Sequence, residues 1–552
     1  MPKLKQLTIE GYRSIDEEIV INFPNNIPLV LLGENNAGKS NIIRAIDLIF
    51  GEFHPKYKKL DDFDHFNRDP KVPIKITAKI SGLVGTLSFK GNQMGCSGLK
   101  FRSVKGSDND FVGIQSTDGK ENQFVKTELR EELLSIIVNS EYNLNYQLSY
   151  SSKFTLLSRV TKAFHEKLSD DPKKISKLKS LFSEIKDTFL EVEEFKVFNK
   201  NMSSIADSIL SNMTHALAFD FSAYDPSNYF KTLKIHPTEN GEIRAFEELG
   251  TGQQQILALS FAHAYAKSFM GQGLIFILDE PEAHLHPLAQ KWLAKKMFQM
   301  AQDGLQLIIT THSPYFIDLN FLEGINLIRK EDNCTYNINH TAQSLYNHCL
   351  QTGSNSKKTS LDSTIPFYAN NSTPHILSGF FAKKIILVEG MTEEFALPIF
   401  FERLGLDSTE FGIEIISVGG KGNLAKWWRL YTLYTIPTFI CFDNDSKKDD
   451  EKGEKRKDAL KAIGIKDEEL ESILSTDDWT ITNNYCIFGK NYETTMRNSF
   501  PDYENIENQI KETLGSSSKN LIARETAKQI NLSSETEGKK QIEIIIEKIR
   551  HL

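Results

Sequence analysis

The sequence has few cysteines, no long apolar segment and no excess of positive charge. Its five cysteines among 552 residues form no CxxC pair, which argues against a zinc site and against a disulfide framework. No run of residues is long and apolar enough for a membrane span. The N-terminus lacks the hydrophobic region of a signal peptide. The composition therefore predicts a cytoplasmic protein without a membrane partner.

The formal net charge of −8 makes the chain modestly acidic. It has no overall basic field that would draw it to nucleic acid. Any contact with DNA would need a local basic patch, which dimerisation could complete. The length allows several domains.

A glycine-containing loop lies between an apolar run at 28–32 and a helical pattern from Asn41. Its sequence, GENNAGKS at 33–40, fits the phosphate-binding pattern GxxxxGK[ST], although a bare match can occur by chance. Glycines let backbone N–H groups curl around a phosphate, and the helix start adds partial positive charge. Lys39 can reach the terminal phosphates, and Ser40 can ligate Mg²⁺. The predicted contacts are Gly33, Asn35, Asn36, Gly38, Lys39 and Ser40.

An acidic pair, Asp279 and Glu280, follows the apolar run at 274–278. A carboxylate at the end of a parallel strand lies beside a phosphate loop, so Asp279 can hold Mg²⁺ with Ser40. Glu280 is then placed to polarise an attacking water. The alternative is a strand end that carries two solvated acids.

Three further segments resemble parts of ABC-type ATPases. Residues 249–255, LGTGQQQ, resemble the LSGGQ signature with Gly250 in the serine position, and 281–287 look like the D-loop. In that family the signature helix covers the ATP of a second subunit. The resemblance therefore assigns Gly250, Gly252 and Gln253 to nucleotide binding across a dimer. His312, after the run at 307–311, resembles the switch histidine.

The opening residues 7–14, LTIEGYRS, resemble the first strand and turn of RecF- and SMC-like ATPases. This resemblance brings Arg13 towards the nucleotide. The gap between Ser40 and the signature exceeds one βαβ unit, so an insertion is expected. Its pattern from 127 to about 213 is predicted to be helical, with apolar spacings such as Leu129, Leu133, Leu134 and Ile137.

A second group of acids follows two apolar runs near the other end. Glu389 ends the run at 383–388, and Asp443 and Asp445 follow the run at 436–442. Carboxyl ends of parallel strands meet at one sheet edge. Carboxylates gathered there repel each other, and divalent cations such as Mg²⁺ or Mn²⁺ relieve that repulsion. The alternatives are an ordinary strand-end acid and a surface turn.

This second group resembles the Toprim domain of topoisomerases, primases and OLD-family nucleases. The resemblance assigns metal binding to Glu389, Asp443 and Asp445, with Glu393 as a second acid one helical turn on. Two metals could activate water and stabilise the leaving oxygen. Glu493 is a further candidate acid, and Lys519 resembles a late catalytic lysine. The competing lysines are Lys490, Lys511 and Lys528.

Three shorter segments are weighed by composition alone. Residues 419–422, GGKG, are either a flexible turn or a loop that approaches phosphate. Residues 446–457 are charged and predicted to form an exposed loop. Trp427 and Trp428, at helical spacing, favour packing over contact with DNA.

The whole order resembles OLD-family (overcoming lysogenisation defect) nucleases, including Gabija-type and retron-associated defence effectors. It implies an α/β chain: an N-terminal ABC-type (RecF/SMC-like) ATPase with a helical dimerisation insertion, then a C-terminal Toprim domain. The expected parts are ATPase lobes at 1–125 and 216–350, the insertion at 126–215, a polar linker at 351–380 and Toprim at 381–552.

The resemblance implies an ATP-binding and ATP-hydrolysing, metal-dependent endonuclease with nucleotide-controlled cleavage. Expected partners are double-stranded DNA, a second copy or higher homo-oligomer, and a defence partner: a helicase-like protein, or a reverse transcriptase with its noncoding RNA. The alternatives are a RecF-like DNA clamp without nuclease activity, a primase or topoisomerase, and an effector acting on RNA or free nucleotide. The sequence leaves the direction of ATP control open.

Overall fold

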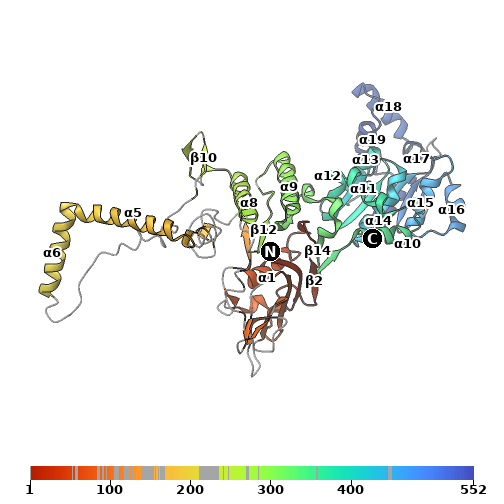
Figure 1. The fold of residues 1–552 in the computed structure, drawn as a ribbon. Coiled ribbons are helices and arrows are strands. Elements are labelled where there is room, and N and C mark those ends of the chain that lie inside the picture. Colours follow the sequence, from red (N-terminus) through yellow and green to blue (C-terminus); the bar gives the residue numbers. More distant parts are fainter. Residues whose placement is uncertain are drawn as a thin grey trace.

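The computed structural model places an ATPase body and a C-terminal body side by side, with two helices projecting away (Figure 1). It describes residues 2–51, 60–83, 96–104, 111–116, 132–138, 168–209, 248–268, 273–283, 285–355, 359–445 and 450–552, with shorter stretches at 54–55, 87–89, 92–94, 125, 130, 155, 157–158, 161, 164, 235, 237–239 and 241–245. In these parts no helix is both long and apolar enough to cross a bilayer.

A six-stranded sheet forms the centre of the ATPase. Its order is β15-β14-β3-β13-β12-β9, and every neighbouring pair is parallel except β14 and β15. The inner strands β3 and β12 are apolar along almost their whole length because both faces of the sheet are buried there. Their bounds are β3 Leu29–Leu32, β9 Leu133–Val138, β12 Gly273–Asp279, β13 Gln306–Thr311, β14 Ile325–Glu331 and β15 Cys334–Asn339.

An antiparallel sheet of order β2-β1-β4-β7-β8 covers one side of this centre. Helix α1 (Lys39–Phe50) lies in the core between the sheets, where Ile42 and Ile46 join the cluster that contains Leu7 and Ile76. The strands are β1 Lys3–Glu10, β2 Ile19–Asn22, β4 Ile74–Ser81, β7 Gly98–Val104 and β8 Phe111–Ser116. Short hairpins pair β5 (Leu87–Phe89) with β6 (Asn92–Met94), and β10 (Thr238–Glu239) with β11 (Glu242–Ile243).

Strand β9 corrects the prediction that the pattern from residue 127 is helical. Leu133, Leu134 and Ile137 lie in this strand, which pairs with β12 from Leu133↔Gly273 to Val138↔Leu278; Leu129 lies outside the described residues. A six-residue apolar run fits one buried strand as well as part of a buried helix. Pairing with β12, and not the local periodicity of the sequence, makes this segment a strand. The predicted range 126–215 therefore contains one strand of the ATPase core.

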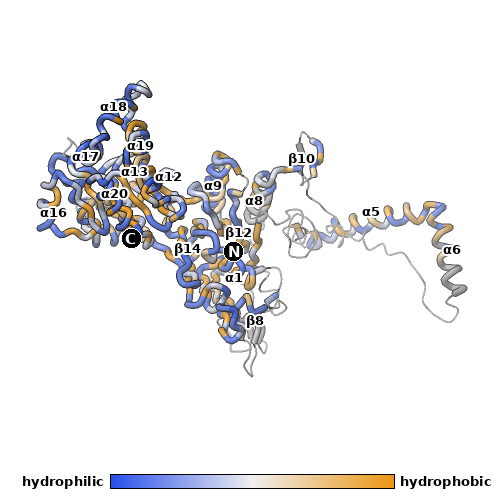
Figure 2. The backbone as a smooth tube through the Cα atoms, turned by 180° about the vertical axis from the view of Figure 1, so that it is seen from behind, coloured by the Kyte–Doolittle hydropathy of each residue, from blue (hydrophilic) through white to orange (hydrophobic). Residues whose placement is uncertain are grey.

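Beyond β9 the expected helices are present and project from the body (Figure 1). Helix α5 (Pro172–Glu191) begins at Asp171, whose side chain accepts hydrogen bonds from the backbone N–H groups of Lys173 and Lys174. Helix α6 (Glu193–Ile209) follows at once. None of the side chains of α5 is buried, and apolar residues recur along it (Figure 2). The exposed apolar residues of this pair include Leu181, Ile185, Phe189, Val197 and Phe198.

Helices also cover the ATPase sheet near its acidic strand. These are α8 (Thr251–Ser268) and α9 (Pro287–Gln302), and Leu293 and Met297 of α9 enter the core. Short 3₁₀ turns complete the ATPase and the junction: η2 Asp62–Asp64, η3 Phe66–Arg68, η7 Pro314–Phe316, η8 Leu319–Gly324 and η9 Gly379–Phe381.

The segment predicted as a polar linker is largely folded. After α10 (Ala342–Gln351) it contains α11 (Leu361–Asn371) and α12 (Pro374–Ser378). The hydroxyl of Tyr368 on α11 donates to the carbonyl of Lys426 on α14 (Lys421–Leu433), 2.7 Å away. Trp427 of α14 is buried beside it, as predicted for a packing residue. The polar composition reflects the outer faces of these helices.

The C-terminal domain has a sheet of order β17-β16-β18-β20-β19, parallel except for the edge strand β19. Its strands are β16 Lys384–Val388, β17 Ile413–Ser417, β18 Thr438–Asp443, β19 Thr480–Ile481 and β20 Tyr485–Phe488. The remaining helices are α13 Met391–Arg403, α15 Glu454–Ala462, α16 Asp467–Leu474, α17 Tyr492–Ser499, α18 Tyr503–Leu514, α19 Lys519–Gln529 and α20 Glu537–Arg550.

One apolar cluster runs from the ATPase into this domain. It joins Ile309 and Phe316 of the ATPase to Leu377 of α12, to Leu387 of β16 and to Trp427 of α14. Packed cores contain few voids that could absorb a displacement, so they transmit strain. We therefore expect a movement in one body to be felt in the other.

Candidate nucleotide-binding and metal-binding sites

The phosphate loop has the backbone shape that its glycines predict. Gly33 and Gly38 have φ of +146° and +112°, and Asn36 has φ of +64°. A Cβ on Gly33 would lie 2.2 Å from the carbonyl oxygen of Ile328, and a Cβ on Gly38 would lie 2.3 Å from Oγ1 of Thr335. Glycine is therefore required at both positions by conformation and by space.

Lys39 lies along the loop and contacts the predicted switch histidine. Its Nζ donates to the carbonyls of Gly33 (2.9 Å) and Glu34 (3.0 Å) and to Nε2 of His312 (2.9 Å). Burial lowers the pKa of Lys39, although Glu280 and Asp279 oppose this. Burial, followed by the Lys39 charge, lowers the pKa of His312. Both shifts favour an imidazole whose Nε2 accepts a hydrogen bond from the Lys39 ammonium.

The acidic pair lies beside this contact. Glu280 has φ of +51° at the end of β12, and its carboxylate is 3.5 Å from His312 Nε2. Asp279 accepts a hydrogen bond from the Thr310 hydroxyl. Ser40 is exposed at the start of α1, where a bound ion would be reached. The structure therefore brings the predicted loop, acids and histidine together.

Glu282 is a neighbouring residue to which the sequence gave no separate role. One of its carboxylate oxygens accepts a hydrogen bond from the backbone N–H of His312, at 2.6 Å. Burial raises the pKa of Glu282. This contact fixes the strand end that presents His312. Its position three residues after Asp279, within the D-loop pattern, is the only sequence signal; His284 of that pattern lies outside the described residues.

Arg13 lies in a tight turn after β1, with φ of +56°. Its Nε and Nη2 donate to Oδ1 of Asp64, at 3.1 and 2.6 Å. Asn41 of α1 donates to the hydroxyl of Ser14, at 2.7 Å, and so ties this turn to the helix that follows the phosphate loop. Asp64 is a partner that the sequence did not indicate, because it comes from a separate segment.

The signature residues form the start of α8. The backbone N–H of Gly250 donates to Oε1 of Gln253, at 3.3 Å. A Cβ on Gly252 would lie 2.1 Å from Cδ2 of Leu285. Within the described part of the chain, no hydrogen bond joins these three residues to the phosphate loop of the same subunit. Their contact with a second subunit's nucleotide stays a prediction.

In the C-terminal domain the predicted acids meet at one sheet edge. Strands β16 and β18 are parallel neighbours, with Val388 opposite Cys441, so Glu389 and Asp443 leave the sheet side by side. Glu393 accepts a hydrogen bond from the N–H of Gly390 at 3.1 Å. Asp443 accepts one from the N–H of Tyr492 at 2.9 Å. Both Glu393 and Asp443 are buried.

The electrostatics of this edge fit a divalent cation. Burial, and then the charges of Glu393, Glu389 and Asp445, raises the pKa of Asp443 to about 8. Burial, with Glu389 and Glu493 nearby, raises the pKa of Glu393 to about 7. Oxygen ligands of this kind suit Mg²⁺ or Mn²⁺. In their present positions no three acids of the described residues are gathered to ligate one ion; Lys421 lies between Asp445 and Glu389.

Ion binding here is expected to release protons below about pH 8. Asp443 and Glu393 must ionise to act as ligands, and pKa values raised to about 8 and about 7 keep Asp443 mostly protonated and Glu393 partly protonated at neutral pH. Mn²⁺ affinity should therefore rise as pH increases from 6.5 to 8.5. Calorimetry in two buffers of different ionisation enthalpy measures how many protons are released when Mn²⁺ binds. That number should be larger at pH 6.5 than at pH 8.5. Equal heats in both buffers at pH 6.5 would contradict this assignment.

Glu493 and Lys519 face each other at the same edge. Their carboxylate and Nζ are 3.0 Å apart, and Lys519 is 73% exposed. The hydroxyl of Thr392 on α13 donates to the side chain of Asn520 on α19, which ties Lys519 to the acidic edge. Two of the competing lysines are held in other ion pairs, Lys511 with Glu507 and Lys528 with Glu525. Geometry thus favours Lys519 over Lys511 and Lys528.

The segment 446–457 is only partly the exposed loop that its charge predicts. Residues 446–449 lie outside the described residues, but Asp450 and Arg456 are 4% and 5% exposed. Arg456 donates to the carboxylate of Asp450 at 2.9 Å and to the backbone carbonyl and side chain of Asn444. Buried charges persist when they are paired. Through Arg456 this pair holds Asn444, the residue between Asp443 and Asp445.

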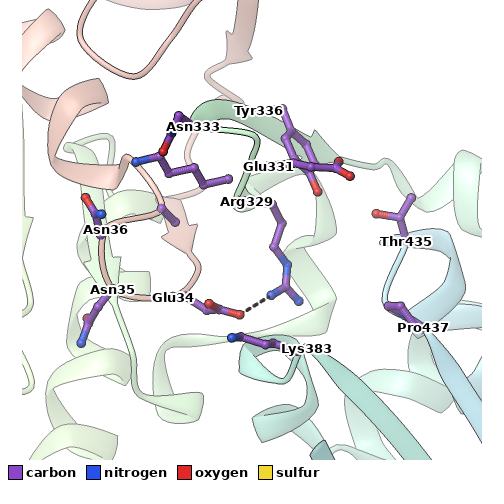
Figure 3. A pocket seen from close by; sticks show the side chains of 12 residues that line it. Glu34, Asn35, Asn36, Arg329, Glu331, Asn333, Tyr336, Lys383, Thr435 and Pro437 are labelled. Atoms are coloured by element: carbon purple, nitrogen blue, oxygen red, sulfur yellow. Dashed lines mark hydrogen bonds and ion pairs between the residues drawn. The ribbon is translucent and has the colours of Figure 1, made fainter. Parts of the chain in front are cut away.

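An arginine joins the phosphate loop to the segment that precedes the first strand of the C-terminal domain, and Figure 3 shows its ion pair with Glu34. Arg329 of β14 donates to Oε1 of Glu34, at 3.2 Å, and to the carbonyl of Ala382, at 2.7 Å. A cavity of about 930 Å³ opens here between residues 34–37 and Lys383. No local pattern could reveal Arg329, since its partners lie far from it in sequence.

Comparison with known proteins matches both halves of the chain. Residues 29–318 match the model described as "AAA domain, putative AbiEii toxin, Type IV TA system". Residues 380–445 match "Overcoming lysogenization defect protein-like, TOPRIM domain".

Full-length relatives have low identity and long coverage. The OLD nuclease of Thermus scotoductus is 24% identical over 85% of this chain and 88% of that protein. The Old nuclease of Escherichia phage P2 is 23% identical over 80% and 77%. Endonuclease GajA of Bacillus cereus is 21% identical over 76% and 71%.

The predicted fold, an ATPase followed by a Toprim domain, is confirmed by the two sheets and by both family models. The first model spans more than half of the 552 residues, and the second begins where the C-terminal sheet begins. The chain belongs to the AAA-domain family and, with its Toprim domain, is an OLD-family ATPase and nuclease.

Proposed function

We propose that this protein cleaves double-stranded DNA with Mg²⁺ or Mn²⁺, under control of ATP, as an antiphage effector. The observation that carries the proposal is the set of acids at the Toprim edge, where burial and neighbouring acids raise the pKa values of Asp443 and Glu393. Cleavage of supercoiled plasmid by the purified protein, with Mn²⁺ and with EDTA, tests it. Metal-dependent nicking or linearisation supports the nuclease, and intact plasmid in every lane opposes it.

At the Toprim edge Glu389, Asp443 and Asp445 would hold the ions, with Glu393 and Glu493 as further ligands. The ions would supply an activated water and a stabilised leaving oxygen. Lys519 is exposed beside Glu493, where it can contact the scissile phosphate and offset its growing charge. Tyr492 orients Asp443 through its backbone N–H.

At the ATPase site the loop residues and Lys39 would hold the phosphates. Ser40 and Asp279 would ligate Mg²⁺. Glu280 can orient the attacking water while His312, already in contact with Lys39, senses the terminal phosphate. Arg13 would approach from the turn after β1. Gly250, Gly252 and Gln253 would complete the site of a second subunit.

Two features support a homodimer or a larger assembly. The signature makes no hydrogen bond with its own phosphate loop among the described residues. Helices α5 and α6 expose apolar side chains to solvent, and exposed apolar stripes of this kind mark contact surfaces. Light scattering after size-exclusion chromatography should give at least twice the 62.8 kDa of one chain; a mass of one chain at every concentration opposes a dimer.

The role in defence, with a helicase-like partner or a reverse transcriptase and its noncoding RNA, rests on the likeness to endonuclease GajA. It is tested by phage plating on cells with and without the intact gene and its neighbours. A RecF-like clamp is the rival function. It requires plasmid binding without cutting at any metal concentration.

Arg329 is the expected route between the two sites. ATP bound at the phosphate loop would move Glu34 and, through Arg329, the contact with Ala382. The strand that follows Ala382 and leads to Glu389 would then have a different free energy with and without ATP. Arg329→Gln should therefore reduce the ATP-dependent change in cleavage rate towards one. Lys330→Gln, an exposed neighbour, is the control. An unchanged ATP response in Arg329→Gln would exclude this route.

A further inference from the structure

We infer that Lys421 is an internal counter-ion of the Toprim acids, which holds Glu389 and Asp445 in the metal-free protein and withdraws when a divalent ion binds them. The inference rests on the proposed metal-dependent function. In addition, Lys421 sets the metal concentration at which the site fills. Lys421 is a positioning residue and not a ligand.

The ammonium of Lys421 lies among acids and is shielded from water. Its Nζ donates to the backbone carbonyl of Asp445 at 2.9 Å, contacts the carboxylate of Asp445, and lies 3.7 Å from Oε2 of Glu389. The side chain of Lys421 is 5% exposed. A buried ammonium is tolerated only when charged partners surround it. The acids are therefore the reason that this lysine points inward.

The backbone before Lys421 delivers it to this position. Gly419 and Gly420 have φ of +70° and +119°, which side chains other than glycine rarely adopt. The N–H of Gly420 donates to the carbonyl of Glu389 at 2.8 Å, so the turn is bonded directly to the acidic strand end. Lys421 then begins α14. The GGKG segment is thus neither a plain flexible turn nor only an open phosphate loop.

Lys421 and a metal ion compete for the same space. An ion that used carboxylate oxygens of both Glu389 and Asp445 would lie where the ammonium now lies between them. Two cations at such short separation repel strongly in a buried site. Asp443 and Glu393 accept hydrogen bonds from backbone N–H groups, and the charge of Lys421 acts on Asp443 by opposing the rise in its pKa. The ion shared by Glu389 and Asp445 is therefore the one that Lys421 opposes.

There is room for the displaced side chain. A groove of about 920 Å³ borders Lys421 and is lined by Gly422, Asn423 and several lysines, among them Lys455 and Lys457. A rotation about its side-chain bonds moves the ammonium from the acids into this groove. Metal binding then moves one positive charge into a groove that acids also line, some of them paired with its lysines, as Glu471 is with Lys457 and Asp467 with Lys461.

The test is Mn²⁺ binding to the full chain without nucleotide or DNA, followed by electron paramagnetic resonance. Lys421→Met and Lys421→Gln should bind Mn²⁺ at least about tenfold more tightly than the unaltered protein, while Lys421→Arg should not. Lys457→Met is the matched control, because it removes one charge from the same groove but its ammonium pairs with Glu471. Asp443→Asn identifies which binding belongs to the Toprim edge.

Thermal unfolding gives an independent readout. Without metal, Lys421→Met should unfold at a lower temperature than the unaltered protein, because Glu389 and Asp445 lose their counter-ion, and Mn²⁺ should remove the difference. Mn²⁺ affinity in Lys421→Met and Lys421→Gln that equals or falls below that of the unaltered protein overturns the inference and leaves the proposed function standing. Absence of Mn²⁺ binding to the unaltered protein overturns both.

Discussion

Asp443→Asn is expected to lower DNA cleavage by roughly a hundredfold to a thousandfold, the scale seen when one electrostatic stabiliser of a transition state is removed. Asparagine keeps the shape of the side chain and can still accept the hydrogen bond from Tyr492 N–H. It loses the negative charge that an ion requires. Plasmid cleavage with Mn²⁺ measures the effect, and Asp478→Asn, an exposed acid of the same domain, is the control.

The same variant should be at least as stable as the unaltered protein above pH 8. The pKa of Asp443 is raised to about 8, so the folded state binds a proton that the unfolded state has already lost. Stability from this group is thus largest at low pH and falls as pH rises towards 8. Asparagine removes that penalty. Loss of cleavage together with lower stability at pH 8.5 would indicate damage to the fold instead.

Lys39→Met is expected to weaken ATP binding by roughly 2–5 kcal/mol, the cost of truncating one partner of a buried charge pair. This corresponds to a loss of about 30-fold to several thousandfold. Lys39 is the cation at the loop, and in the nucleotide-free chain its ammonium contacts two loop carbonyls and His312. A fluorescent ATP analogue measures the affinity. Binding within twofold of the unaltered protein would refute the assignment.

Lys39→Met should not harm the nucleotide-free fold. Burial lowers the pKa of Lys39, which means that its charge is disfavoured there until phosphates arrive. Methionine fills similar volume without a charge. Thermal unfolding without ATP should therefore be unchanged or higher, and the stabilisation by ATP seen in the unaltered protein should disappear. Lys330→Met provides the control for loss of one positive charge nearby.

Residues whose position follows from the end of a strand could be predicted from sequence. Each of these residues follows an apolar run, and parallel strands bring their ends to one edge of a sheet. They are Asp279 and His312 in the ATPase sheet, and Glu389 and Asp443 in the C-terminal sheet. The phosphate loop was equally readable, because its glycines and Lys39 act through local backbone geometry. In these cases the chemistry is written within a few consecutive residues.

Residues that act through distant partners could not be predicted in this way. Arg329 joins Glu34 to Ala382, and Asp64 holds Arg13. Lys421 lay in a recognised segment, but its inward direction depends on acids from two other strands. The strand at Leu133–Val138 was misread because a short buried run carries no period that separates strand from helix.

The central claim is that the nucleotide state of the ATPase sets the activity of the Toprim site. Glu280→Gln should bind ATP and hydrolyse it slowly, which holds the ATP-bound state. The measurement is its plasmid cleavage rate with Mn²⁺ at saturating ATP and without ATP. The account predicts rates that differ at least about tenfold, in either direction, and a difference that collapses when Arg329→Gln is added. Equal rates with and without ATP, in a preparation shown to bind ATP, would contradict it.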